Sequence, residues 1–132
     1  MGGVAGLRLL LDTHIWIWLA TQSERLKIRD VLRNPSNELW LSPLNTWEVL
    51  TLCRKKRIAL DRDAADWVEA ATAGTHEAPL TRQVVLAAHD LPLHDDPVDR
   101  FLAATALVYE LVLVTADDKL LNLPGVHVMA NS

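Results

Sequence analysis

Four acidic residues stand where they could act together on one substrate. Asp12 ends a run of three leucines, and Asp117 follows a second apolar run. Glu48 and Asp99 each lie shortly after a helix-start signal. Carboxylates brought together repel one another and raise one another's pKa unless a cation compensates. Oxygen ligands without a Cys/His pattern suit a hard ion such as Mg²⁺ or Mn²⁺.

One or two such ions can activate water and stabilise the leaving oxygen when a phosphodiester is hydrolysed. We therefore predict a catalytic metal site whose ligands are four acids: Asp12, Glu48, Asp99 and Asp117. Each acid also has a simpler structural explanation. Asp12 could cap the following helix, and Asp99 could form a capping box with Asp96. Asp117 and Asp118 could favour a helix N-terminus through its dipole. Glu48 could be a solvated helix residue.

The segments that carry these acids alternate between strand-like and helix-like patterns. We expect strands at Arg8–Asp12, Leu39–Leu41, Glu77–Leu80, Leu111–Thr115 and Val126–Met129. We expect helices over residues 14–20, 24–33, 43–56, 63–73, 82–89, 97–110 and 117–121, several of them with Ser, Thr or Asp as the N-cap: Thr13, Ser23, Ser42, Thr81 and Asp96. This alternation predicts an α/β domain with a mostly parallel sheet covered on both faces. Ligands of such sheets bind beyond the carboxyl ends of the strands.

The five tryptophans are many for this length, and we expect most of them in the core. In the helix of residues 43–56 the pattern predicts that Leu44, Trp47 and Leu50 face inward, with Val49 and Cys53 as further candidates. A tryptophan left exposed near the first two helices would mark a protein partner rather than a platform for stacking bases.

Length and composition limit the class of protein. A chain of 132 residues that is 50% hydrophobic fits one folded domain, which we place at residues 1–132. The formal charge of −4 does not by itself favour a nucleic-acid binder or a membrane-surface protein. Setting the four site acids aside leaves 13 acidic and 13 basic residues, so RNA binding stays open. A single cysteine, Cys53, allows no internal disulfide and favours a reducing cytoplasm.

The N-terminus needs one distinction. Met1–Gly6 is small and predicts a flexible tail. Arg8 and the apolar stretch after it superficially resemble a signal peptide, but Asp12 and His14 interrupt that stretch. We therefore expect neither a signal peptide nor a membrane span.

Four motifs together resemble a known family. They are Leu-Leu-Asp12-Thr13-His14, Ser42-x-x-x-x-Trp47-Glu48, the run from Asp96 to Ala106, and Leu113-Val-Thr-Ala-Asp117. In this combination the chain resembles a PIN domain, specifically the VapC-like toxins of bacterial toxin–antitoxin pairs. The resemblance covers about residues 7–129. Its most specific part is Asp-Pro-x-Asp-Arg-x-Leu-x-Ala-x-Ala, which begins at Asp96.

The resemblance implies a metal-dependent endoribonuclease with a three-layer α/β/α fold and no covalent enzyme intermediate. The four acids match the family's acidic positions one for one, and Thr13 and Thr115 match its recurrent hydroxyls. Asp96 and Asp118 are extra acids nearby, interpreted as a cap and as a further residue near the metals. The resemblance also implies an RNA substrate, with transfer RNA as the family-level expectation, and a homodimer. It further implies an antitoxin that covers the first helices and directs a basic side chain to the acids.

Several basic residues and histidines could take part in binding RNA or in the acidic site. Arg54–Arg57 follows Glu48, and Lys55 lies two helical turns after that acid, on the same face. Lys55 could bind a phosphate, or the run could simply complement the helix C-terminus. Arg100 could contact RNA or pair with an acid. Of the five histidines, we expect only His14 near the acids and the others in structural or surface positions.

Other classes of function remain open at this point. The acids could hold metal only structurally, in a binding module that acts by sequestering its partner. A phosphoacceptor domain also combines strand-end acids with a Thr and a Lys, here Thr115 and Lys119. It needs an acceptor at the end of a middle strand, and the second expected strand ends at Ser42. A haloacid-dehalogenase-like phosphatase would need an Asp where this chain has His14.

Overall fold

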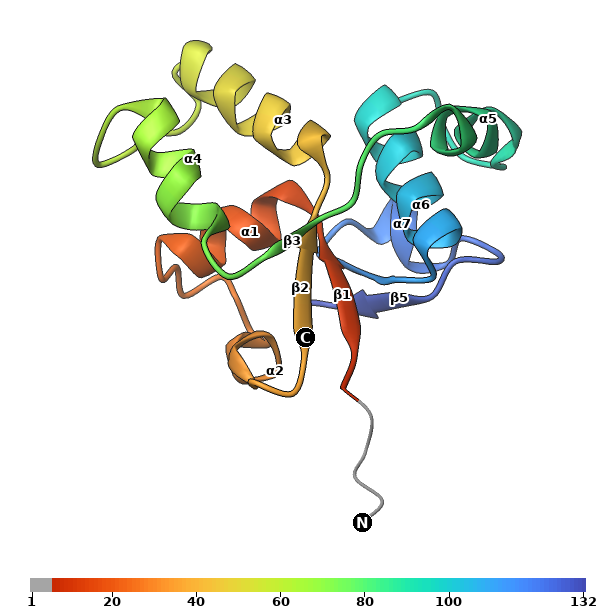
Figure 1. The fold of residues 1–132 in the computed structure, drawn as a ribbon, viewed down its shortest axis with the longest axis horizontal. Coiled ribbons are helices and arrows are strands. Elements are labelled where there is room, and N and C mark those ends of the chain that lie inside the picture. The colour runs from red at the N-terminus through yellow and green to blue at the C-terminus, as the bar shows by residue number, and fades with distance from the viewer. Residues whose placement is uncertain (1–5) are drawn as a thin grey trace.

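A five-stranded sheet runs through the middle of the computed structural model, which describes residues 6–132 (Figure 1). The strands are β1 (Arg8–Leu11), β2 (Glu38–Leu41), β3 (His76–Glu77), β4 (Val112–Thr115) and β5 (Val128–Ala130). Their order is β3-β2-β1-β4-β5, and every neighbouring pair is parallel. The strand at the centre of the sheet is therefore β1, whose carboxyl end leads directly into Asp12.

The described residues form seven helices around the sheet: α1 (Thr13–Ala20), α2 (Arg29–Arg33), α3 (Pro43–Arg54), α4 (Ala64–Thr72), α5 (Arg82–Asp90), α6 (Pro97–Tyr109) and α7 (Asp118–Leu121). Figure 1 shows α1, α3 and α4 on one side of the central strands and α5 and α6 on the other. No helix among residues 6–132 is both long and apolar enough to cross a lipid bilayer.

Alternation along β1 builds a separate core on each face. Leu9 and Leu11 are fully buried in a cluster with side chains of α1–α4, including Trp16, Val49 and Trp67. Leu10 points the other way, into a cluster with residues of α6, β4 and α7. Successive side chains of a strand point to opposite faces, so three consecutive leucines serve two cores. The arrangement confirms the predicted three-layer α/β/α fold with a parallel sheet.

Three of the five predicted N-caps are confirmed, and those of α1 and α2 are wrong. Ser42, Thr81 and Asp96 accept hydrogen bonds from backbone N–H groups of α3, α5 and α6, respectively. The cap of α1 is Asp12 and not Thr13, which is the first helical residue and is fully buried. A backbone N–H bonded to the Asp12 carboxylate satisfies one of the free donors at the helix start.

The predicted helix over residues 24–33 is wrong in its first half. Only α2 is helical, and the N-cap of α2 is Ile28, not Ser23. Asn131 explains the difference: its side chain accepts a hydrogen bond from the Lys27 N–H at 2.6 Å and donates to the Arg25 carbonyl at 2.8 Å. These bonds use the backbone groups that a helix would have required, and they come from a residue more than 100 positions away.

The inward position predicted for Trp47 is also wrong. Its side chain is 53% exposed, and the Arg54 guanidinium carbon lies 5.5 Å from the ring centroid. The buried residues of α3 are Asn45 and Val49, four positions apart, so the further candidate Val49 is confirmed, whereas Cys53 is only partly buried. Trp47 lies two positions from Asn45 and from Val49 and so faces away from the core.

The predicted flexible tail, Met1–Gly6, lies mostly outside the described residues. Gly6 is described, and its backbone packs so closely on the Ser36 carbonyl that a Cβ atom would overlap it.

Candidate functional site

Asp12 and Asp117 come together because β1 and β4 are neighbours in the sheet. The Asp12 N–H donates to the Val114 carbonyl at 2.9 Å, which extends the strand pairing to the acid itself. The Thr115 hydroxyl donates to Asp12 Oδ2 at 2.7 Å and accepts from the Asp117 N–H at 3.0 Å. One buried hydroxyl thus holds both acids at the carboxyl edge of the sheet.

Both acids are helix caps as well. Asp12 Oδ1 accepts from the Thr13 N–H at 2.7 Å, and Asp117 Oδ1 accepts from the Lys119 N–H at 2.9 Å. Asp12 and Asp117 therefore cap helices and line the cavity at the same time. A carboxylate fixed by a cap keeps one orientation, which is what a ligand-binding group requires.

Glu48 reaches the same edge through an arrangement that the sequence analysis did not include. Asn45, fully buried, accepts from the Ser42 N–H at 2.7 Å and completes the capping box of α3. Its amide donates to the Leu11 carbonyl at 3.0 Å and to Thr13 Oγ1 at 3.1 Å. The start of α3 is thereby anchored to the end of β1, and this places Glu48, one turn further on, beside Asp12.

Asp99 comes from the first turn of α6, where Asp96 caps its N–H at 3.2 Å. Its side chain does not complete a capping box. Asp99 Oδ2 instead lies 2.7 Å from Nε2 of His94. The prediction that only His14 would lie near the acids is therefore wrong, because the loop before α6 folds back and brings His94 to the site. In the sequence, the one indication of this contact is that His94 stands five positions before Asp99.

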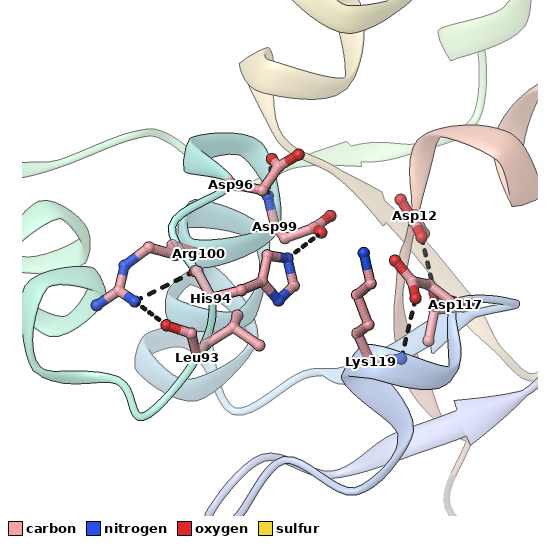
Figure 2. A network of polar contacts seen from close by, with 9 residues as sticks. Asp12, Leu93, His94, Asp96, Asp99, Arg100, Asp117 and Lys119 are labelled. Atoms are coloured by element: carbon pink, nitrogen blue, oxygen red, sulfur yellow. Dashed lines mark hydrogen bonds and ion pairs between the residues drawn. The ribbon is translucent and has the colours of Figure 1, made fainter.

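The acids surround one cavity of about 330 Å³, lined by Asp12, His14, Trp18, Glu48, Asp96, Asp99, Ala116 and Asp117. All four predicted ligands thus face a common space. Figure 2 shows Asp12 and Asp117 on one side of it and Asp99 on the other, with the Lys119 side chain extending between them. No basic side chain forms an ion pair with Asp12, Glu48 or Asp117 within residues 6–132.

Burial raises the pKa of three of these carboxyl groups: Asp12, Glu48 and Asp99. Hydrogen bonds from Thr115, Thr13 and His94, in the same order, oppose that rise in part. The acids also raise one another's pKa, since Asp12 acts on both Glu48 and Asp99. A cation in the cavity would relieve the cost of burying these negative charges.

The residues fit a hard divalent cation by their chemistry, because carboxylate oxygens are the ligands that such ions prefer. Most polar side chains that line the cavity are carboxylates, and within residues 6–132 no Lys or Arg side chain forms an ion pair with them. Across residues 6–132, no three Asp, Glu, His or Cys side chains are grouped closely enough to enclose an ion by themselves. An ion in this cavity would therefore need water or substrate phosphate among its ligands, as is common for Mg²⁺.

Other candidates lie away from the cavity. Asp118 is exposed at the start of α7 and does not line it. Lys55 is the C-cap of α3, exposed at the far end of that helix. Arg100 neither pairs with an acid nor faces the cavity. Its guanidinium donates to five backbone carbonyls: those of Ala88, His89, Leu91, Leu93 and His94.

Comparisons with known proteins identify the family and the fold. A model of the PIN domain family matches residues 9–126. Ribonuclease VapC22 of Mycobacterium tuberculosis is 28% identical over 115 residues, which are 85% of this chain and 88% of the relative. A structure of VapBC2 from Rickettsia felis, bound to promoter DNA, is similar with a TM-score of 0.73 and 13% identity, over 94% of this chain and 98% of that one. A toxin–antitoxin complex from Klebsiella pneumoniae is similar with a TM-score of 0.66 and 19% sequence identity, over 94% of this chain and 98% of that one.

The two structural likenesses concern the fold alone, whereas the family match extends from β1 beyond α7 and includes all four acids. The chain belongs to the PIN-domain family.

Proposed function

We propose that this chain is a metal-dependent endoribonuclease that hydrolyses phosphodiester bonds in RNA. One observation carries the proposal: four carboxylates from four separate segments face a single cavity at the carboxyl edge of a parallel PIN-domain sheet. The name of the relative VapC22, a ribonuclease, supports RNA as the substrate class. Transfer RNA is the narrower expectation, and the single cysteine, Cys53, supports a reducing cytoplasm as the location.

In this mechanism Asp12, Glu48, Asp99 and Asp117 would supply the carboxylates that bind Mg²⁺ or Mn²⁺. When bound, the ion would stabilise negative charge on the phosphodiester and lower the pKa of a water molecule, so that hydroxide would be available as the nucleophile at neutral pH. The protein's own contribution is orientation: Thr115 holds Asp12 and Asp117, and His94 holds Asp99. Lys119, which extends between the acids in Figure 2, is placed to contact a phosphate oxygen.

We also propose that the chain is the toxin of a toxin–antitoxin pair. A second cavity, of about 290 Å³, lies between α1 and α4 and is lined partly by apolar groups, including Trp16, Leu19 and Trp67. Its partly apolar lining and its position beside α1 support binding of an antitoxin segment there. A homodimer is part of the same proposal, and sedimentation of the purified chain would test it.

The test uses the purified chain, freed of any partner, with RNA and Mn²⁺. We expect cleavage that stops when a chelator is added, and no cleavage by Asp12→Asn or Asp99→Asn. Asp118→Asn is the matched control, because this acid is exposed beside the site without lining the cavity, and it should cleave normally. Cleavage by Asp99→Asn at the rate of the unaltered chain would overturn the assignment.

Two other functions are distinguished by the same material. Tight Mn²⁺ binding without any cleavage would favour a binding module whose acids hold metal structurally. Ser42 does not exclude a phosphoacceptor domain, because the middle strand of the sheet is β1, which leads into Asp12. The PIN-domain match is instead the reason to set that reading aside.

A further inference from the structure

Asp99 and Arg100 are neighbours in α6, yet their side chains take opposite directions. Asp99 faces the acidic cavity, while Arg100 extends away from it toward the loop that joins α5 to α6 (Figure 2). Arg100 is bonded to the carbonyls of Ala88 and Leu91 at 2.7 and 3.0 Å, and also to those of His89, Leu93 and His94. One guanidinium therefore fixes both the end of α5 and the loop that follows.

That loop carries the only side chain that holds Asp99 within the described residues. His94 Nε2 lies 2.7 Å from Asp99 Oδ2, in a partly sheltered pair whose side chains are 31% and 18% exposed. When Asp99 is ionised it can only accept, so the imidazole must carry its proton on Nε2. The bond engages Oδ2, and no hydrogen bond within residues 6–132 engages Oδ1.

We propose that His94 and Arg100 are positioning residues of the metal site: Arg100 fixes the loop, the loop places His94, and His94 orients Asp99 toward the cavity. The inference rests on the proposed metal site. Groups that orient a metal ligand from behind typically change metal affinity about 10–100-fold when they are removed. A planar guanidinium can bind several carbonyls at once, which a lysine ammonium on a flexible stem cannot reproduce.

The experiment measures Mn²⁺ binding to the full chain by calorimetry, independently of RNA cleavage. His94→Ala should weaken binding by about 10-fold or more. His94→Gln should restore most of the loss, because its amide N–H can reach the position of Nε2. The matched control is His89→Ala, which removes an exposed imidazole near the same loop and should leave affinity within about twofold.

A double-mutant cycle tests whether Arg100 acts through His94. Arg100→Lys should weaken Mn²⁺ binding by roughly 10-fold in the unaltered chain. In the His94→Ala background it should change binding by no more than about twofold, because the partner it positions is gone. Circular dichroism identifies any variant that is unfolded. If Arg100→Lys is one of them, the comparison of His94→Ala with His94→Gln decides alone.

Three results would overturn the inference: unchanged affinity in His94→Ala, tighter binding in His94→Ala, or fully additive effects of the two substitutions. Tighter binding would mean that His94 competes with the ion for Asp99. Asp12→Asn separates this failure from failure of the proposed function. If the unaltered chain and Asp12→Asn bind Mn²⁺ equally poorly, the metal site itself is wrong. If only Asp12→Asn loses binding, the site stands and the positioning role falls.

Discussion

The hydroxyl of Thr115 donates a 2.7 Å hydrogen bond to Asp12 Oδ2, joining residues 103 positions apart across the pair of strands β1 and β4. The same oxygen accepts from the Asp117 N–H. Thr115 is fully buried, so this contact is not exchanged with water. It connects two of the four acids directly, and its removal should affect both.

Thr115→Val keeps the shape of the side chain and removes the hydroxyl. We expect the pKa of Asp12 to rise further, because the bond that opposes its burial is lost. Mn²⁺ binding should weaken by about 10-fold, as is usual for a residue that orients a ligand. The measurement is calorimetry at neutral pH. Thr105→Val is the control, because Thr105 is equally buried but bonds only to the Phe101 carbonyl within α6. Equal losses in both variants would contradict the prediction.

Stability without metal should fall as pH rises through the titration of the site. Burial raises the folded-state pKa of Asp12, Glu48 and Asp99, so between the unfolded and folded values the folded chain binds more protons than the unfolded chain. The free energy of unfolding then decreases with pH in that window. Below the window these three groups impose no such loss. Mn²⁺ should therefore raise the Tm at pH 7.5 more than at pH 4.5.

Glu48→Gln provides the direct test of that sign. The variant cannot ionise, so in the absence of metal its Tm should exceed that of the unaltered chain at pH 7.5 and match it at low pH. A change of 1 kcal/mol corresponds to about 4 °C for a domain of this size, which scanning fluorimetry resolves. Glu69→Gln, an exposed position on α4, is the control. The interpretation fails if the two variants show the same dependence on pH.

Asn45 should be the most sensitive polar position of the fold. Asn45→Ala removes the bonds to Ser42, Leu11 and Thr13, all of them made by buried groups. We expect the free energy of unfolding to fall by about 3 kcal/mol, measured by urea denaturation. Asn122→Ala, at an exposed helix end, should stay within about 0.5 kcal/mol. A loss at Asn45 no larger than at Asn122 would show that the connection between α3 and β1 is dispensable.

Lys119 and Lys55 should contribute to RNA binding through charge. In the Asp99→Asn background, which does not cleave, each Lys→Met change should lower the dependence of log K on log salt by about 0.7 for single-stranded RNA. Lys119 should have the larger effect on affinity, because it reaches between the acids (Figure 2). Arg33→Met is the control, because Arg33 belongs to α2, which lies at the amino ends of the central strands, whereas the acids lie at their carboxyl ends (Figure 1). An equal loss in Arg33→Met would mean that binding is a general charge effect.

The sequence by itself determined the fold class and the four acids. Apolar runs, capping residues and Pro at helix starts are local signals, and Asp12, Asp99 and Asp117 occupy caps or first turns that such signals define. Because parallel strands end at one edge, local structure was enough to bring these acids near one another.

Only the tertiary structure decided what holds the acids and which side chains face them. His94 reaches Asp99 because Arg100 binds the loop, and Asn131 prevents a helix at Lys27 from across the chain. Asn45 takes the buried face of α3, which leaves Trp47 in solvent. Each of these outcomes depends on a hydrogen bond between segments that are separate in the sequence. Such a bond forms only when donor and acceptor lie close together in the fold, and local propensity and periodicity do not predict which segments meet.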